Sequence, residues 1–244
     1  MIVDCQSLTC GYGRKAVAHD VSFSLRAGEI CAVVGHNGAG KSTFIKTLLG
    51  LQPPLSGGFD WHKDALKKCA YLGQRGEFDG QFPIRVRDMV MMGAWHGLGF
   101  WSHIDDDKKA KGEQALAQTN LQHMADRPVF ECSSGQLQRC FFARAIVQDA
   151  PLILLDEPFT AIDQATQANL IEIIKGWREQ GRGLVIVLHD LSAVKGLCDT
   201  VLLLGKGRSL FGTSDEVLTT KNLLDYGYLS QMQADWMTDL ARGM

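Results

Sequence analysis

One octapeptide restricts the possible folds of this chain more than any other feature, namely Gly35-His36-Asn37-Gly38-Ala39-Gly40-Lys41-Ser42. The all-apolar residues 30–34 before it predict a buried strand, and apolar side chains at helical spacing after it, from Phe44 to Leu49, predict a helix. Glycines let the backbone wrap closely around a ligand, and the N–H groups of a helix N-terminus attract anions. The sequence therefore predicts a phosphate-binding loop between a strand and a helix.

The pattern of this loop predicts roles for its residues. Lys41 should reach the β- and γ-phosphates of a nucleotide, and the hydroxyl of Ser42 should coordinate Mg²⁺. The other loop residues, together with Thr43, should bind the nucleotide mainly through backbone N–H groups. The pattern alone predicts only a nucleoside triphosphatase, because kinases, GTPases and motor proteins share it.

The rest of the chain alternates between strand and helix patterns. Residues 152–155 and 184–188 are all apolar, as central parallel strands are, and residues 201–204 precede a turn that predicts a hairpin. Residues 21–25 predict short antiparallel strands near the N-terminus, whereas residues 75–150 show helical patterns. We therefore expect an α/β fold, a P-loop NTPase core with a mainly parallel sheet, an N-terminal antiparallel β subdomain and a helical insert.

A pair of acids, Asp156 and Glu157, directly follows the predicted strand 152–155. The pair should therefore lie at the carboxyl edge of the sheet, where open α/β sheets bind their ligands. We expect Asp156 to hold Mg²⁺, through water, and Glu157 to polarise the attacking water as a general base.

Composition and charge argue against several classes of function. The net charge of −2 argues against a broad nucleic-acid surface, which requires clustered Lys and Arg. Seven scattered cysteines without a CxxC pair favour a reducing cytoplasm. We expect no signal peptide, and no apolar run approaches the roughly 20 residues that cross a bilayer. If the protein serves transport, another chain must form the pore.

The stretch Cys132-Ser133-Ser134-Gly135-Gln136 identifies a family when it is read with the motifs above. It resembles the signature motif of the ATP-binding-cassette (ABC) ATPases, and residues 1–220 resemble that family as a whole. In the family, this turn opens a helix and contacts the γ-phosphate bound by a partner subunit, and a helix N-terminus is suited to that contact. Here the usual Leu-Ser-Gly-Gly-Gln has become Cys-Ser-Ser-Gly-Gln, so that Ser134 replaces a glycine.

The resemblance implies roles for four further residues. Tyr12 matches the aromatic residue that stacks on adenine, and Gln74 matches the glutamine that touches Mg²⁺ and senses the permease. Asp163 matches the loop that, in the family, links the two active sites across the dimer. His189 matches the switch histidine, which would contact the γ-phosphate and hold Glu157 and water in line.

The resemblance also implies an organisation into domains. Residues 1–225 would form the ABC ATPase domain, with residues 1–74 and 151–225 as its α/β core and residues 75–150 as its helical subdomain. Residues 226–244 would form a C-terminal tail, whose role the sequence does not indicate.

The partners and the cargo follow from the same resemblance. An ABC ATPase acts as a pair of cassettes with ATP and Mg²⁺, attached to an integral membrane permease on the cytoplasmic face of the plasma membrane. Residues 82–93 and the Trp/His/Gly-rich segment after them resemble zinc and manganese importers, and iron-chelate importers carry similar inserts. An importer would also need a separate substrate-binding protein that contacts the permease. Residues 75–82 are the expected permease-binding face.

Other readings of the sequence remain open at this point. A soluble ABC ATPase of DNA repair or translation would carry two fused cassettes or a long coiled coil, whereas this chain has one motif set and no heptad run. A GTPase or small-molecule kinase would leave the turn 133–136 unexplained, and no Asn-Lys-x-Asp stretch is present. An ABC exporter is a further alternative, although exporters often fuse the cassette to its membrane domain.

Overall fold

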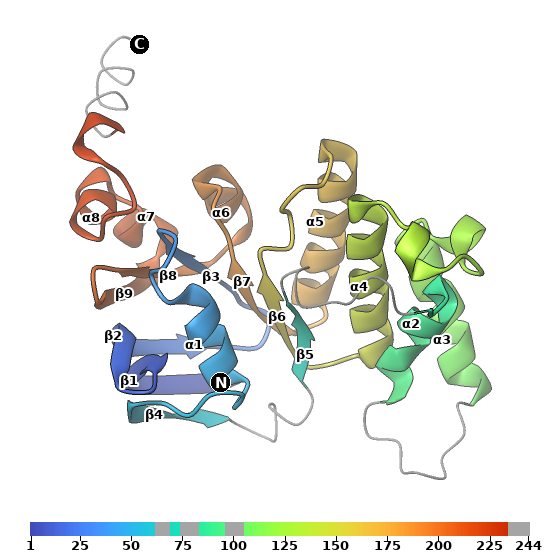
Figure 1. The fold of residues 1–244 in the computed structure, drawn as a ribbon, viewed down its shortest axis with the longest axis horizontal. Coiled ribbons are helices and arrows are strands. Elements are labelled where there is room, and N and C mark those ends of the chain that lie inside the picture. The colour runs from blue at the N-terminus through green and yellow to red at the C-terminus, as the bar shows by residue number, and fades with distance from the viewer. Residues whose placement is uncertain (62–68, 74–82, 96–104, 234–244) are drawn as a thin grey trace.

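The computed structural model describes residues 1–61, 69–73, 83–95 and 105–233 (Figure 1). The strands are β1 (Val3–Tyr12), β2 (Lys15–Leu25), β3 (Ile30–Gly35), β4 (Ser56–Trp61), β5 (Cys69–Leu72), β6 (Leu152–Asp156), β7 (Gly183–Val187), β8 (Thr200–Gly205) and β9 (Arg208–Thr213). The α-helices are α1 (Lys41–Leu48), α2 (Val86–Met91), α3 (Asp106–Gln118), α4 (Ser134–Gln148), α5 (Gln164–Glu179), α6 (Leu191–Leu197), α7 (Ser214–Val217) and α8 (Thr220–Asp225). Short 3₁₀ turns occupy Met92–Trp95, Gln122–Met124 and Val129–Glu131.

The strands form two sheets. The larger has the order β5-β6-β7-β3-β8-β9, in which all neighbours are parallel except the β8–β9 hairpin. Lys206 and Gly207 form the tip of that hairpin, and both have positive φ, as tight hairpin turns require. The smaller sheet is antiparallel, with the order β2-β1-β4.

The larger sheet separates two hydrophobic cores. Successive side chains of a strand point to opposite faces, so Ile30, Ala32 and Val34 of β3 enter one core and Cys31 and Val33 enter the other. Side chains of α2 to α8 join the first core, in which α2 and α3 pack beyond α4, whereas α1 and the antiparallel sheet join the second. The molecule therefore has three layers, which is why its central strands are apolar on both faces.

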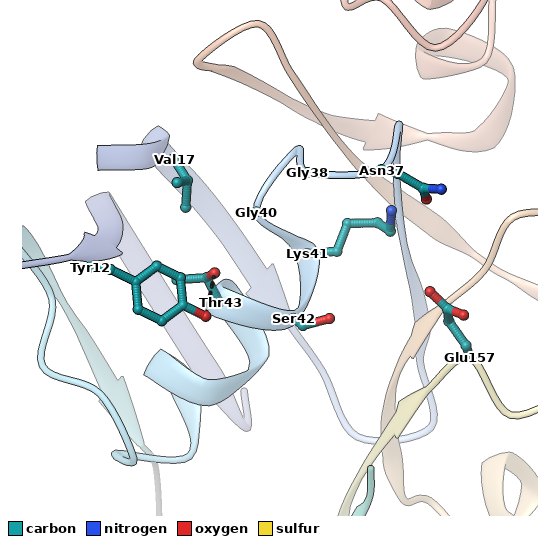
Figure 2. A pocket seen from close by; sticks show the side chains of 9 residues that line it. All are labelled: Tyr12, Val17, Asn37, Gly38, Gly40, Lys41, Ser42, Thr43 and Glu157. Carbon is teal, nitrogen blue, oxygen red and sulfur yellow. Dashed lines mark hydrogen bonds between the residues drawn. The ribbon is translucent and has the colours of Figure 1, made fainter. Parts of the chain in front are cut away.

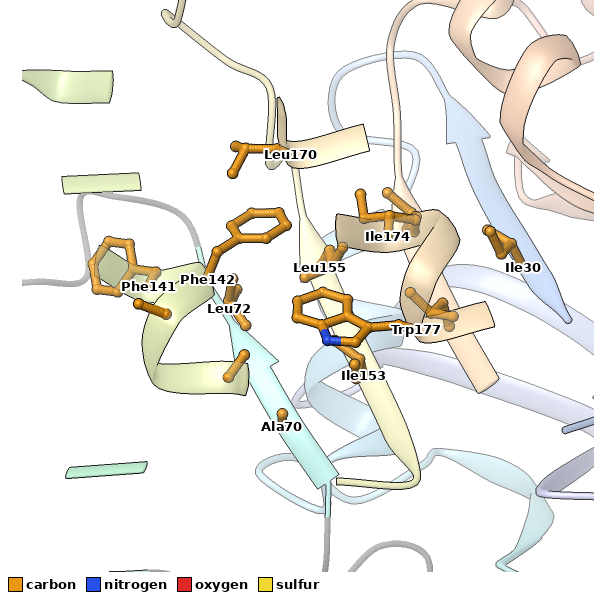
Figure 3. Close-up of a cluster of buried hydrophobic side chains, with 14 of the residues drawn as sticks. Ile30, Ala70, Leu72, Phe141, Phe142, Ile153, Leu155, Leu170, Ile174 and Trp177 are labelled. Atoms are coloured by element: carbon orange, nitrogen blue, oxygen red, sulfur yellow. The ribbon is translucent and has the colours of Figure 1, made fainter. Parts of the chain in front are cut away.

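The helices between residues 86 and 148 share the first of these cores with the α/β region. Phe142 of α4 stacks on Trp177 of α5, with ring centroids 5.4 Å apart and planes 9° from parallel (Figure 3). Both side chains are buried, so this contact fixes α4 against α5. These helices fall within the expected helical subdomain 75–150, but the domain boundaries themselves stay predictions.

The fold class predicted from the sequence is confirmed, including the parallel sheet and the antiparallel β subdomain. The antiparallel strands β1 and β2, with 10 and 11 residues, are longer than the short strands expected. Gln74 and the expected permease face 75–82 lie outside the described residues. Within the described ranges, every helix is too short or too polar to pass through a lipid bilayer.

Candidate nucleotide-binding site

The predicted phosphate-binding loop connects the end of β3 to the start of α1. Gly38 and Gly40 have φ values of 83° and 98°, which residues other than glycine rarely adopt. A Cβ on Gly40 would also approach Val17 Cγ2 to 3.1 Å and Ala18 Cβ to 3.2 Å, both on β2. Glycine therefore allows the loop to pass close to β2 and to turn its backbone toward the start of α1.

Lys41, the first residue of α1, holds its ammonium group at the loop. The side chain is buried, and Nζ donates to the carbonyl oxygens of Gly35 at 2.8 Å and His36 at 3.1 Å. Burial lowers the pKa of Lys41, while the carboxylates of Glu157 and Asp156 raise it. The positive charge of this ammonium, at the start of a helix, allows it to donate hydrogen bonds to an anion such as phosphate.

A cavity of about 320 Å³ opens beside this loop. Its lining residues are Tyr12, Val17, Asn37, Gly38, Gly40, Lys41, Ser42, Thr43 and Glu157 (Figure 2). Gly35, His36 and Ala39 shape the loop without lining the cavity. The lining thus includes eight residues of the predicted site, and it adds Val17, which sequence reasoning missed.

Tyr12 lies at one end of this cavity and Glu157 at the other. The Tyr12 ring is 56% exposed, and its hydroxyl accepts a hydrogen bond from Thr43 Oγ1 at 3.1 Å. Lys41 and Ser42 lie between Tyr12 and Glu157 in Figure 2. An exposed aromatic ring, a phosphate-type loop and a carboxylate therefore follow one another along a single cavity.

The donor set near Ser42 fits a hard divalent cation such as Mg²⁺. The Ser42 hydroxyl points toward the side of the cavity where Glu157 lies (Figure 2), and the buried Asp156 ends β6 beside Glu157. Hydroxyl and carboxylate oxygens are the ligands that Mg²⁺ prefers, together with substrate phosphates. Gln74, the third expected contact to this ion, lies outside the described residues.

Glu157 and His189 form a close pair at the same edge of the sheet. His189 Nε2 lies 2.7 Å from Glu157 Oε1, and Thr160 Oγ1 donates to Oε2 of the same carboxylate at 3.4 Å. Glu157 has a φ of 54°, a left-handed conformation that costs a residue other than glycine roughly 1–2 kcal/mol. This strained turn directs the Glu157 carboxylate both toward His189 and into the cavity that contains Lys41.

The turn formed by Ser133, Ser134, Gly135 and Gln136 begins α4 with two reciprocal hydrogen bonds. The backbone N–H of Gln136 donates to Ser133 Oγ at 3.3 Å, and the backbone N–H of Ser133 donates to Gln136 Oε1 at 2.8 Å. This capping box explains why Ser134 can replace the usual glycine, because Ser134 is an ordinary first helical residue here.

Asp163 lies next to that turn. Its carboxylate caps α5 by accepting from the backbone N–H and the hydroxyl of Thr166, both at 2.8 Å, and these hydrogen bonds lower the pKa of Asp163. A Cβ on Gly135 would lie 3.7 Å from Asp163 Oδ2. The N-termini of α4 and α5 are thus neighbours.

The turn 133–136, named the signature turn from here on, is separated from the cavity that Lys41 lines, named the nucleotide cavity. None of Ser133, Ser134, Gly135 and Gln136 lines that cavity. In Figure 1, α1 and α4 lie on opposite sides of β6. A single chain therefore brings together Lys41, Ser42, Glu157 and His189, but leaves the signature turn elsewhere.

Residues 18–160 match the sequence profile of the family described as ABC transporter, which is more than half of the chain. This chain belongs to the ABC transporter family. It is a nucleotide-binding ATPase subunit of that family.

Curated relatives and a solved structure agree with this assignment. The chain is 36% identical to the manganese transport system ATP-binding protein MntB of Listeria innocua, over 91% of this chain and 94% of the relative. It is 39% identical to the zinc transport system ATP-binding protein TroB of Treponema pallidum, over 83% and 77% of the two chains. A metal-chelate type ABC transporter, solved in an inward-facing conformation, aligns with a TM-score of 0.83 and 30% identity, covering 93% of this chain and 89% of that chain.

Replacing Gly40 by alanine tests the loop geometry of this ABC ATPase. The added Cβ meets Val17 and Ala18 of β2 at 3.1–3.2 Å, so loop and strand must shift by a few tenths of an ångström, and the backbone conformation at position 40 is one that alanine disfavours. We expect the affinity for ATP, measured by calorimetry, to fall about tenfold, because a strain of 1–2 kcal/mol opposes the binding conformation.

Gly50→Ala is the matched control, since Gly50 also has a positive φ but a Cβ there meets nothing within 4 Å. Equal ATP affinities for the Gly40 and Gly50 variants would contradict the assigned role of the loop.

Proposed function

We propose that this chain supplies the energy for an ABC importer of a divalent metal ion, manganese or zinc, or of an iron chelate. The ATPase part of the proposal rests on one observation, the cavity in which Lys41 and Ser42 face Glu157, whose carboxylate is also in contact with His189. The cargo part rests on the relatives named above, whose names specify manganese, zinc and metal-chelate transport.

In the proposed hydrolysis, each side chain has a separate task. Lys41 binds the β- and γ-phosphates, and Tyr12 packs on the adenine ring at the other end of the cavity. Ser42 and Asp156, with Gln74, hold Mg²⁺, which would offset negative charge on the phosphates. Glu157 accepts a proton from the attacking water.

His189 is proposed to align the reacting groups. Its Nε2 already lies 2.7 Å from the Glu157 carboxylate, so the imidazole can hold that carboxylate toward the water. The same ring is the proposed contact of the γ-phosphate, where a donor would stabilise the charge that develops in the transition state.

A second copy of the chain is proposed to complete each site. Ser133, Ser134, Gly135 and Gln136 form a helix N-terminus suited to phosphate, yet they lie away from the cavity of their own chain. In a homodimer, the turn of one copy would cover the nucleotide of the other and exclude water. Asp163, beside that turn, would then lie at the contact between the two copies.

The proposed partners follow from an importer function. The chain would bind an integral membrane permease at the cytoplasmic face of the plasma membrane, as a peripheral subunit, with residues 75–82 as the contact. A separate substrate-binding protein would deliver the metal to that permease. Nucleic acid is not an expected partner, because the net charge is −2.

Glu157→Gln tests the proposed general base. The substitution keeps the size of the side chain but removes its basicity, so we expect the rate of phosphate release to fall by about 10²–10⁴-fold. The variant should still bind ATP and should remain a dimer in ATP by size-exclusion chromatography. Glu179→Gln, the same change at an exposed residue at the end of α5, should leave the rate unchanged. Wild-type hydrolysis by Glu157→Gln would refute the assignment.

Mixing two inactive variants tests whether the sites are shared between copies. Lys41→Ala removes the phosphate-binding ammonium, and Gly135→Asp puts a negative charge where phosphate should meet the turn. A Cβ on Gly135 meets no atom closer than 3.6 Å, so the chain should still fold.

In a mixed dimer, one site combines the intact Lys41 of one copy with the intact Gly135 of the other. About half of the dimers in an equimolar mixture are mixed, and each has one intact site of two, so the mixture should regain about one quarter of wild-type ATPase activity. A mixture as inactive as either variant alone would show that both elements act within one chain.

Metal uptake tests the proposed cargo. A strain that lacks this chain should accumulate less manganese, zinc or iron from metal-limited medium, measured by elemental analysis of washed cells. Wild-type protein should restore the metal content, whereas Glu157→Gln should not, because uptake requires hydrolysis. Normal contents of all three metals in the deletion strain would refute the cargo while leaving the ATPase assignment intact.

A further inference from the structure

The end of α8 and the residues after it are fixed onto the β8–β9 hairpin. Lys206 Nζ donates to the carbonyl of Leu224, and Arg208 donates to that of Asp225, both at 3.1 Å. The Arg208 guanidinium also lies 5.1 Å from the centre of the Tyr226 ring. The backbone of Tyr226 passes so close to β8 that a Cβ on Gly205 would lie 1.9 Å from its carbonyl oxygen. Only glycine at position 205 allows this approach.

Tyr228, two residues further on, extends from this fixed segment to the Glu157–His189 pair. Its hydroxyl donates a hydrogen bond to the backbone carbonyl of His189. Gly227, with a φ of 71°, makes the turn that brings the Tyr228 ring into place. The backbone N–H of Tyr228 donates to the carbonyl oxygen of Leu223 at 2.8 Å. Burial, and secondarily the charge of Asp190, raise the pKa of Tyr228, so the phenol keeps its donor proton.

The Tyr228 hydroxyl binds His189, and the residues on both sides of His189 are also held by hydrogen bonds. On one side of His189, the backbone N–H of Leu188 donates to Val33 of β3 at 3.2 Å. On the other side, Asp190 caps α6 by accepting from the backbone N–H of Ser192 at 2.9 Å. The Tyr228 hydroxyl holds the peptide carbonyl between them. Because that peptide sets the direction of the His189 side chain, its orientation governs where the imidazole meets Glu157.

We infer that Tyr228 is a positioning residue for ATP hydrolysis, which holds the His189 backbone so that the imidazole stays against the Glu157 carboxylate. The inference rests on the roles proposed above for Glu157 and His189. It assigns a task to part of the segment after residue 225, for which the sequence indicates none.

Tyr228→Phe should lower kcat without changing KM for ATP. The variant loses one oxygen atom, and with it the bond to His189, whereas Tyr228 does not line the nucleotide cavity. We expect kcat to fall about three- to tenfold, the range that corresponds to one hydrogen bond of ordinary strength. KM should stay at its wild-type value, because the contacts of the phosphate-binding loop are unchanged.

Tyr226→Phe is a matched control within the same segment. The Tyr226 hydroxyl also donates to a backbone carbonyl, that of Ser209 on β9, at 3.1 Å. Both substitutions therefore remove a phenol that binds a main-chain oxygen, and both should lower the melting temperature by similar amounts. Only the Tyr228 substitution acts on the residue that contacts Glu157, so Tyr226→Phe should keep the wild-type kcat.

The decisive experiment compares kcat and KM of the full chain in four variants. These are Tyr228→Phe, Tyr226→Phe, His189→Ala and the double variant His189→Ala with Tyr228→Phe. If Tyr228 acts through His189, the double variant should hydrolyse ATP at the same rate as His189→Ala alone.

Three outcomes would overturn the inference. One is a wild-type kcat for Tyr228→Phe when His189→Ala is impaired, and the second is an equal loss of kcat in both phenylalanine variants. The third is a further loss in the double variant, which would mean that Tyr228 acts elsewhere. A wild-type kcat for His189→Ala would instead refute the proposed role of His189. Failure of the proposed function can therefore be told apart from failure of the inference about Tyr228.

Discussion

Parallel pairing of β3, β7 and β6 is the interaction on which the candidate site depends. In this register Val33 pairs with Val187, and Val187 pairs with Asp156. The three strands therefore end side by side, and the segments that follow them meet at one edge, although β3 lies more than a hundred residues before β6 and β7 in the chain. The phosphate-binding loop, Glu157 and His189 come from these segments. Main-chain hydrogen bonds between the strands thus set the relative positions of these segments.

The same pairing explains how much of the site could be predicted from the sequence. Strands buried on both faces must be apolar throughout, so β3, β6 and β7 stand out, and the polar residues directly after them were predictable site residues. Val17 and Tyr228 were not predictable in this way. Val17 lines the cavity because the loop at Gly40 passes close to β2, and Tyr228 reaches His189 because the chain turns at Gly227. Both contacts depend on tertiary packing between segments distant in sequence, which local patterns do not record.

The antiparallel sheet shows a second limit of sequence reasoning. The register of β1 against β2 shifts three times, between Cys5 and Leu8, between Leu8 and Cys10, and between Cys10 and Gly11. Each shift breaks the alternation by which a half-buried strand is recognised, so these strands are longer than the pattern indicated. β4 is harder still, because it contains adjacent glycines. The irregular strands nevertheless matter to the site, since β1 ends at Tyr12 and β2 carries Val17.

The capping box at the start of α4 has an electrostatic consequence. Two side-chain oxygens of the signature turn, Ser133 Oγ and Gln136 Oε1, accept hydrogen bonds from within the turn. An approaching anion would be repelled by those oxygens. It would be attracted by the donor hydrogens of the serine hydroxyl and of the glutamine NH₂. Because the turn engages these two acceptors internally, its donor hydrogens can face an anion. Less reorientation of dipoles would then be needed when a negatively charged group docks there.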